Sequence, residues 1–181
     1  MKKKVVWAED SVFSLQLRED LFTLVQMRRN HIMQFFDVRR PINDWTGVDL
    51  NTHRALFYIF VAENRIKLLF VDKLDATQVT PSREPIPKLM LSAVIGNAGV
   101  YGASLIELDS DYSTEKQRIV KESLTPGRDL ETIHKHELVG MIGDPEKLRK
   151  RLIRYFDTGV NWDDAKSFLF KGIPLPAPEK H

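Results

Sequence analysis

The 181-residue sequence lacks several features that mark common protein classes. It contains no cysteine, which excludes a disulfide framework and any metal site built on thiolates. Its longest apolar run, from Ala55 to Ala62, has the length of a strand, far below the roughly 18 residues needed to span a bilayer. The basic start at residues 2–4 is followed by Glu9 and Asp10 instead of the apolar core of a secretion signal. We therefore expect a cytoplasmic protein that does not associate with membranes.

A strong charge of one sign is also missing. The chain has 27 Lys and Arg against 25 Asp and Glu, a net charge of +2, and acids separate its short basic runs. Proteins that bind nucleic acid usually show a larger basic excess with aromatic residues between the charges. The charge pattern therefore disfavours nucleic acid as the partner.

Residues 11–38 carry the clearest structural pattern in the chain. The segments 11–17, 21–27 and 31–38 are rich in Val, Ile, Leu and Phe, and the first alternates apolar and polar residues. Such alternation is typical of a strand with one face on a core. The connections are too short for a parallel crossover, so the sequence predicts an antiparallel meander of three strands.

The segment after the meander reads as a loop, then two more strands, then another loop. Pro41, Gly47 and their polar neighbours predict a loop in which Trp45 either covers the sheet or anchors a partner, and we favour the buried alternative. The strands are expected at 55–62 and 65–71, joined by a tight turn. Three prolines in 75–92 predict a long surface loop.

Further short strands are expected in the second half, followed by two helices. The strands are predicted at 105–108, 117–121 and 137–142, with a turn at 125–127. Asp144 and Pro145 predict a helix over 145–157 that ends at Gly159. Asn161 is expected to cap a second helix over 162–170, whose apolar residues include Trp162 and Phe168.

These elements predict an α+β fold: a curved, mostly antiparallel sheet that starts as a meander, with two C-terminal helices packed on it. The length suits one domain over residues 1–172. The proline-rich segment 173–181 is expected to be an extended or disordered tail.

Two clusters resemble catalytic or ligand sites only superficially. His134 and His136 would share one face of a strand, but no third ligand follows at a fixed spacing, and Lys135 between them opposes a cation. The glycines of 96–102 have neither the spacing of a dinucleotide-binding loop nor the Lys-Ser/Thr of a phosphate loop. We therefore expect no metal, no cofactor, no small-molecule substrate and no enzymatic turnover.

Acidic residues are the remaining candidates for function. Glu107, Asp109 and Asp111 alternate along the end of a predicted strand, and Asp163 and Asp164 are adjacent near the second helix. The first three carboxylates suit acid–base chemistry, a hard cation, a basic partner or a solvated loop. We consider the loop first and the partner second.

The opening of the chain resembles the immunity protein 26 family of bacterial polymorphic-toxin and contact-dependent inhibition systems. The resemblance is carried by residues 10–17, 21–27 and 35–37 and extends over about the first 70 residues. Ser11, Gln16 and Val25 depart from the family pattern, in which an acid, a proline and a small residue are common.

This resemblance implies an immunity protein that binds a cognate toxin domain, for example a nuclease, and covers its active surface without catalysis. The candidate contacts for the toxin are the five acids Glu107, Asp109, Asp111, Asp163 and Asp164, together with Trp45. The alternative is a module for RNA or other single-stranded nucleic acid. It would use the basic loops at 28–29 and 39–40 together with aromatic residues of the sheet.

Overall fold

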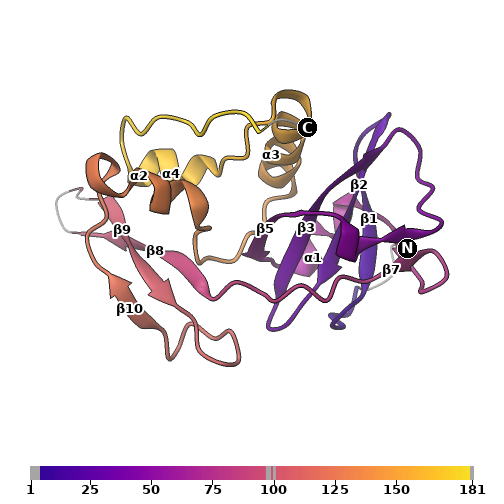
Figure 1. The fold of residues 1–181 in the computed structure, drawn as a ribbon, viewed down its shortest axis with the longest axis horizontal. Helices are drawn as coiled ribbons and strands as arrows, with labels where there is room; N and C mark the ends of the chain where they lie inside the picture. The colour runs from indigo at the N-terminus through magenta and orange to yellow at the C-terminus, as the bar shows by residue number, and fades with distance from the viewer. Residues whose placement is uncertain (1–4, 97–98, 100, 180–181) are drawn as a thin grey trace. The chain divides into compact units, whose positions relative to one another are not determined.

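The computed structural model describes residues 5–96, 99 and 101–179, and the chain divides into two compact units. Unit 1 comprises residues 1–86 and 141–153, and unit 2 comprises residues 87–140 and 154–181. Figure 1 shows the ribbon of both units. The single domain expected over residues 1–172 stays a prediction.

Unit 1 is built on a five-stranded sheet in the order β5-β3-β2-β1-β6, and every neighbouring pair is antiparallel. Its strands are β1 (Val12–Arg18), β2 (Leu21–Met27), β3 (Ile32–Arg40), β5 (Ala55–Phe60) and β6 (Phe70–Leu74). Phe13 lies opposite Val25, which in turn lies opposite Phe35, so one apolar row crosses the meander. The three-stranded meander and the strand expected at 55–62 are confirmed.

One apolar cluster of unit 1 encloses Trp45. The indole is 1 % exposed, and its Nε1 donates a hydrogen bond to Asn43 Oδ1 at 2.7 Å. Two short strands beside it, β4 (Val48–Asp49) and β7 (Val79–Thr80), pair in parallel. The buried members of this cluster are Val12, Phe22, Leu24, Phe36, Trp45, Val48, Leu50, Leu74 and Val79. Of the two roles considered for Trp45, the buried one agrees with the structure.

The strand expected at 65–71 is wrong over most of its length. The chain forms the short helix α1 (Glu63–Ile66) and a 3₁₀ turn (Lys67–Leu69) before β6 begins. Ile66 and Leu69 are buried whereas Leu68 is 56 % exposed, so the apolar positions follow a helical spacing instead of an alternating one. The helical segment also carries the chain from one edge of the sheet to the other, where β6 pairs with β1.

Unit 2 contains a three-stranded antiparallel sheet in the order β10-β9-β8, with helices packed on it (Figure 1). Its strands are β8 (Leu89–Ile95), β9 (Tyr101–Glu107) and β10 (Arg118–Lys121). The helices that lie wholly in this unit are α2 (Pro126–Lys135) and α4 (Asp164–Leu169). Sheet and helix side chains share one core: Leu91, Ala103, Leu105, Leu124, Ile133, Trp162, Leu169, Phe170 and Ile173.

Helix α3 (Pro145–Thr158) confirms the helix expected at 145–157. Asp144 Oδ1 accepts hydrogen bonds from the main-chain N–H groups of Glu146 and Lys147 at 3.0 and 3.3 Å, as a capping residue does. Gly159 ends the helix with a φ of +77°, and its N–H donates to the carbonyl of Tyr155 at 2.7 Å. None of the described helices is long and apolar enough to cross a membrane.

Two expectations between residues 120 and 142 are wrong. The turn predicted at 125–127 is the start of α2, where Thr125 is the N-cap and Pro126 takes the first helical position. Residues 137–142 form no strand. Leu138 makes a single bridge to Leu91 before the chain bends at Gly140.

The second predicted helix is shorter than expected. It spans α4 and is capped by Asp163, whose Oδ1 accepts from the N–H of Ala165 at 2.9 Å, instead of by Asn161. The expected tail at 173–181 has no helix or strand over its described part. Ile173 is buried at its start, and the N–H of Glu179 donates to the carbonyl of Gly159 at 2.9 Å. The described tail is thus extended and attached near both of its ends.

Candidate functional site

A row of buried polar side chains crosses the sheet of unit 1. Gln26 of β2 lies opposite Gln34 of β3, which lies opposite Tyr58 of β5. Residues directly opposite each other on antiparallel strands project to the same face. Gln26 and Gln34 are fully buried, and Tyr58 is 9 % exposed. We call these three residues the polar row.

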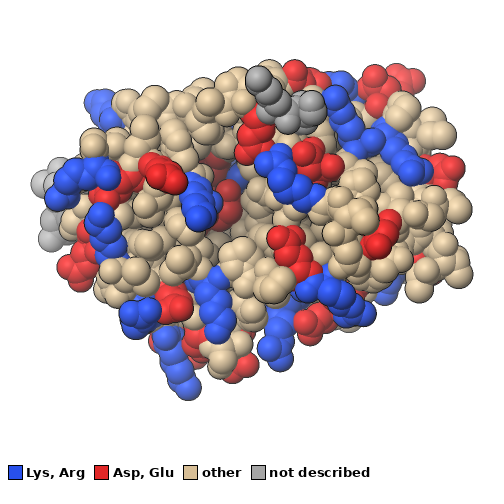
Figure 2. Space-filling view, in the orientation of Figure 1, with Lys and Arg blue, Asp and Glu red and all other residues tan. Residues whose placement is uncertain are grey.

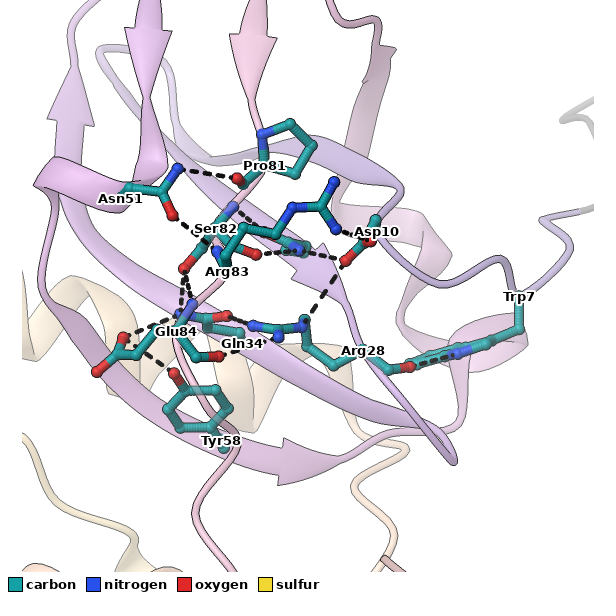
Figure 3. Close-up of polar contacts among 11 residues, drawn as sticks. Trp7, Asp10, Arg28, Gln34, Asn51, Tyr58, Pro81, Ser82, Arg83 and Glu84 are labelled. Atoms are coloured by element: carbon teal, nitrogen blue, oxygen red, sulfur yellow. Dashed lines mark hydrogen bonds and ion pairs between the residues drawn. The ribbon is translucent and has the colours of Figure 1, made fainter. Parts of the chain in front are cut away.

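The chain segment Pro81–Glu84, here called the strap, lies over the polar row (Figure 3). Gln26 makes two hydrogen bonds to the main chain of Ser82. Its Oε1 accepts from the Ser82 N–H at 2.8 Å, and its Nε2 donates to the Ser82 carbonyl at 3.1 Å. The side-chain amide thus satisfies both main-chain groups of Ser82, as a neighbouring strand would.

Two further side chains hold the main chain of the strap. Asn51 donates to the carbonyl of Pro81 at 3.1 Å and accepts from the N–H of Arg83 at 2.7 Å. Arg28 Nη2 donates to the carbonyl of Glu84 at 3.0 Å. Main-chain groups of all four strap residues are therefore bound by side chains of unit 1 (Figure 3).

Side chains of unit 1 also contact the side chains of the strap. Glu84 Oε2 accepts from the Tyr58 hydroxyl at 3.0 Å and from Gln34 Nε2 at 3.4 Å. Arg83 forms an ion pair with Asp10 at 2.7 Å. Burial, followed by the Glu84 carboxylate, raises the pKa of Tyr58 well above its ordinary value, which favours the protonated hydroxyl that donates to Glu84.

The first group of predicted acids lies at the end of β9 and serves the local chain. Glu107 Oε2 binds the guanidinium of Arg118 on β10 at 2.5 and 3.1 Å. Asp109 Oδ1 accepts from the N–H groups of Asp111 and Ser113 at 2.9 and 2.8 Å. Asp111 is exposed. The loop interpretation thus accounts for Glu107 and Asp109, and a partner contact through these acids stays a prediction.

The second group of predicted acids lies at the start of α4. Asp163 is its N-cap, and Asp164 Oδ1 binds Arg154 Nη1 at 2.8 Å while its side chain remains 77 % exposed. The structure does not bring the two acidic groups together. Phe168 of α4 contacts Tyr101 at the start of β9, whereas Glu107 ends that strand, about 20 Å away at ~3.3 Å per residue.

Three exposed apolar residues of unit 2 meet at the hairpin end of its sheet. Ile95 of β8 lies opposite Tyr101 of β9, and the Tyr101 and Phe168 rings are 4.7 Å apart. Their exposed fractions are 71 % for Ile95, 43 % for Tyr101 and 63 % for Phe168. We call these residues the apolar cluster. Sequence pattern does not indicate this cluster, because it places Phe168 among the apolar residues of the helix expected over 162–170.

His134 and His136 do not share one face of a strand. His134 is on α2 and its Nε2 contacts the carbonyl of Pro174 at 2.9 Å, whereas His136 follows the helix. Burial, with the nearby Lys135 cation, lowers the pKa of His136. In the described part of the chain, no three His, Asp or Glu residues are grouped to hold a metal ion. Within the glycine segment, residues 97, 98 and 100 lie outside the described residues.

The surface charge is mixed. Figure 2 shows acidic and basic side chains interspersed over the visible face, as expected from a net charge of +2. No curated protein and no solved structure matches the chain. One family model, described as a domain of unknown function (DUF8309), matches residues 2–174, and the chain therefore belongs to the DUF8309 family.

Proposed function

We propose that this protein acts by binding another protein, as an antitoxin-type immunity protein that covers the active surface of a cognate toxin domain in the cytoplasm. The observation that supports this proposal best is the exposed apolar cluster of Ile95, Tyr101 and Phe168. The resemblance of residues 10–37 to immunity proteins supplies the class of partner. The mechanism requires occupancy of the toxin and no turnover.

The apolar cluster has the properties of an interface centre. Large aromatic side chains placed together dominate the energy of most protein interfaces, and a few of them carry most of the affinity. Tyr101 is held on a paired strand and Phe168 on a capped helix, so little conformational entropy is lost when a partner packs on them. A preformed aromatic pair of this kind suits tight binding.

One acidic residue, Asp164, lies beside the apolar cluster, exposed although paired with Arg154. Asp164 precedes Phe168 by four residues on α4, a spacing that places both side chains on the same helix face. A polar rim around an apolar centre is the usual anatomy of an interface, and acidic rim charges speed association with a basic partner. We therefore assign the toxin contact to the apolar cluster with Asp164 at its rim. Asp111 follows the other end of β9 and is not part of the assigned toxin contact.

The alternative of a nucleic-acid module is weaker for structural reasons. Bases stack on exposed aromatic rings, but Phe35 and Phe36 of the sheet are fully buried. Arg28, one of the four basic loop residues, is buried under the strap and binds Gln34 and the main chain of Glu84. No specific contact favours this second function.

A protection assay tests the proposed function. The chain is co-expressed in bacteria with a toxin domain taken from a gene adjacent to its own, and growth is followed with co-purification of the pair. We expect growth to be restored by the unaltered chain and lost with Phe168→Ala. Ile119→Ala is the matched control, because Ile119 is also an exposed apolar residue of unit 2, at 53 %. Failure of the unaltered chain to protect or to co-purify contradicts the proposal.

Charge reversal tests the rim separately from the centre. Asp164→Lys is expected to slow association with a basic toxin, with an effect that shrinks as salt rises. Asp111→Lys makes the same charge change at the distant end of β9 and is expected to leave the rate within about twofold. Equal effects of the two reversals on the association rate would show that only the net charge matters. Asp164 would then not belong to the proposed toxin-binding surface.

A further inference from the structure

We propose that the polar row is a peptide-binding site which the chain's own strap fills in this structure, and that an extended segment of a partner protein exchanges with it. The site lies in unit 1 and does not depend on the toxin contact assigned to unit 2. Its ligand is an extended peptide with a basic residue followed by an acidic residue, as in Arg83 and Glu84 of the strap.

The contacts of the strap are those of peptide recognition instead of ordinary sheet pairing. Gln26, Asn51 and Arg28 hold five main-chain groups of the strap, from the carbonyl of Pro81 to that of Glu84. Main-chain recognition of this kind accepts any extended chain, whatever its side chains. Because side chains and not a strand ladder provide these bonds, the strap can leave without breaking the sheet.

Two side-chain contacts add selectivity to this main-chain recognition. The Tyr58 hydroxyl and Gln34 amide both donate to the Glu84 carboxylate, which fits an acid at the fourth position. Asp10 binds the Arg83 guanidinium, which fits a base at the third position. A carboxylate and a guanidinium are matched by charged hydrogen bonds, which are stronger than neutral ones.

The polar row lies on the sheet, and most of the strap that covers it remains accessible to solvent. The polar row lies on three adjacent paired strands, so the sheet sets the main-chain positions of its three residues. Of the four strap residues, only Ser82 is buried, and both Arg83 and Glu84 are exposed. Burying a row of amides is unfavourable unless each amide finds a hydrogen-bond partner. When the strap leaves, the unpaired amides of the polar row therefore favour the binding of another extended chain.

Native-state amide hydrogen exchange on the full chain tests whether the strap opens. The N–H groups of Ser82 and Arg83 report the strap, and the N–H of Met27, bonded to the Ser11 carbonyl at 2.9 Å, reports the sheet. We expect the strap amides to exchange at least about 100-fold faster than Met27, because local opening requires less free energy than global unfolding. Equal protection of all three amides would make the strap a fixed part of the fold and overturn the proposal.

Peptide binding tests the exchange itself. The probe is a fluorescent peptide of residues 78–88, and the receptor is the full chain with Ser82→Pro, which removes the strap N–H bound by Gln26. We expect this variant to bind the peptide at least about tenfold more tightly than the unaltered chain, whose tethered strap competes at high effective concentration. An N-methylated Ser82 peptide, and one with Arg83 and Glu84 interchanged, should bind at least about tenfold more weakly.

Each result of the peptide titration either supports or overturns the proposed exchange. Equal affinity of the two receptors for the peptide, or of the receptor for all three peptides, overturns the proposal. If Ser82→Pro does not fold by circular dichroism, the hydrogen-exchange result on the unaltered chain decides. The toxin contact is assigned to unit 2, which the strap variant does not change. If peptide exchange fails while the toxin still binds, only the present proposal fails. Failure of the proposed function is therefore distinguishable from failure of this one.

Discussion

Replacing Gln26 by alanine should destabilise unit 1 strongly, although the residue is polar. Its amide satisfies the N–H and carbonyl of Ser82 and also donates to Asp10 Oδ1 at 2.9 Å. An unpaired buried polar group costs about 1–3 kcal/mol, and the lost methylene adds about 0.8 kcal/mol. Allowing for water that enters the space, we expect Gln26→Ala to lower the free energy of unfolding by about 2–4 kcal/mol.

Urea unfolding followed by tryptophan fluorescence and circular dichroism measures this change. Trp45 is buried in unit 1 and Trp162 in unit 2, so fluorescence follows both units. The control is Gln16→Ala, which removes the same amide from an exposed position of β1 and should change stability by less than about 0.5 kcal/mol. A loss below about 0.5 kcal/mol for Gln26→Ala would refute the role given to its hydrogen bonds.

Three further changes test other parts of the fold. Leu152→Ala should lower the free energy of unfolding by about 2–5 kcal/mol, because Leu152 is fully buried, and a loss below about 0.5 kcal/mol would make α3 peripheral. Hydrogen bonds from Lys121 and the Thr125 N–H lower the pKa of Asp129 below its ordinary value. A lowered pKa stabilises the fold above the unfolded value of 3.8 and loses that effect as the pH falls through the folded pKa, so the stability advantage over Asp129→Asn should shrink in urea melts below about pH 4. An unchanged advantage would contradict the ion pair. Gly159→Ala should destabilise the chain and speed proteolysis of the tail, because the φ of +77° is unfavourable for alanine and its Cβ would meet the main chain of Glu179. Unchanged proteolysis would show that the tail is not attached there.

Local pattern predicted the meander and α3 well. Residues 11–38 alternate, and their connections are too short for anything but antiparallel pairing, so β1, β2 and β3 follow from the sequence. Helix α3 has its start and its end encoded in Asp144, Pro145 and Gly159.

Local pattern failed where two structures fit the same residues. The segment from Ile66 to Phe70, apolar except for Lys67, suits a strand, yet its burial follows a helical spacing that depends on packing in the completed core. Pro126 and Gly127 fit a turn as well as they fit the first residues of a helix. In both places tertiary packing decides between two local conformations of similar energy.

The candidate sites depend on contacts between distant residues. Gln26 and Gln34 are polar residues of predicted strands, and their partner Ser82 lies 56 and 48 residues further along the chain. Phe168 reads as a core residue of an amphipathic helix, yet Leu169 takes the core position beside it. Neither feature leaves a signal within one segment of sequence.

The binding constant for the toxin domain tests the central claim most directly. A candidate toxin domain, sought in the genes adjacent to that of this chain as the proposed function requires, is titrated with the unaltered protein, with Phe168→Ala and with the control Ile119→Ala. We predict submicromolar binding by the unaltered chain, binding at least about 30-fold weaker for Phe168→Ala, and a change within about twofold for Ile119→Ala. Equal affinities for Phe168→Ala and the unaltered chain would contradict the assignment of the binding surface to the apolar cluster.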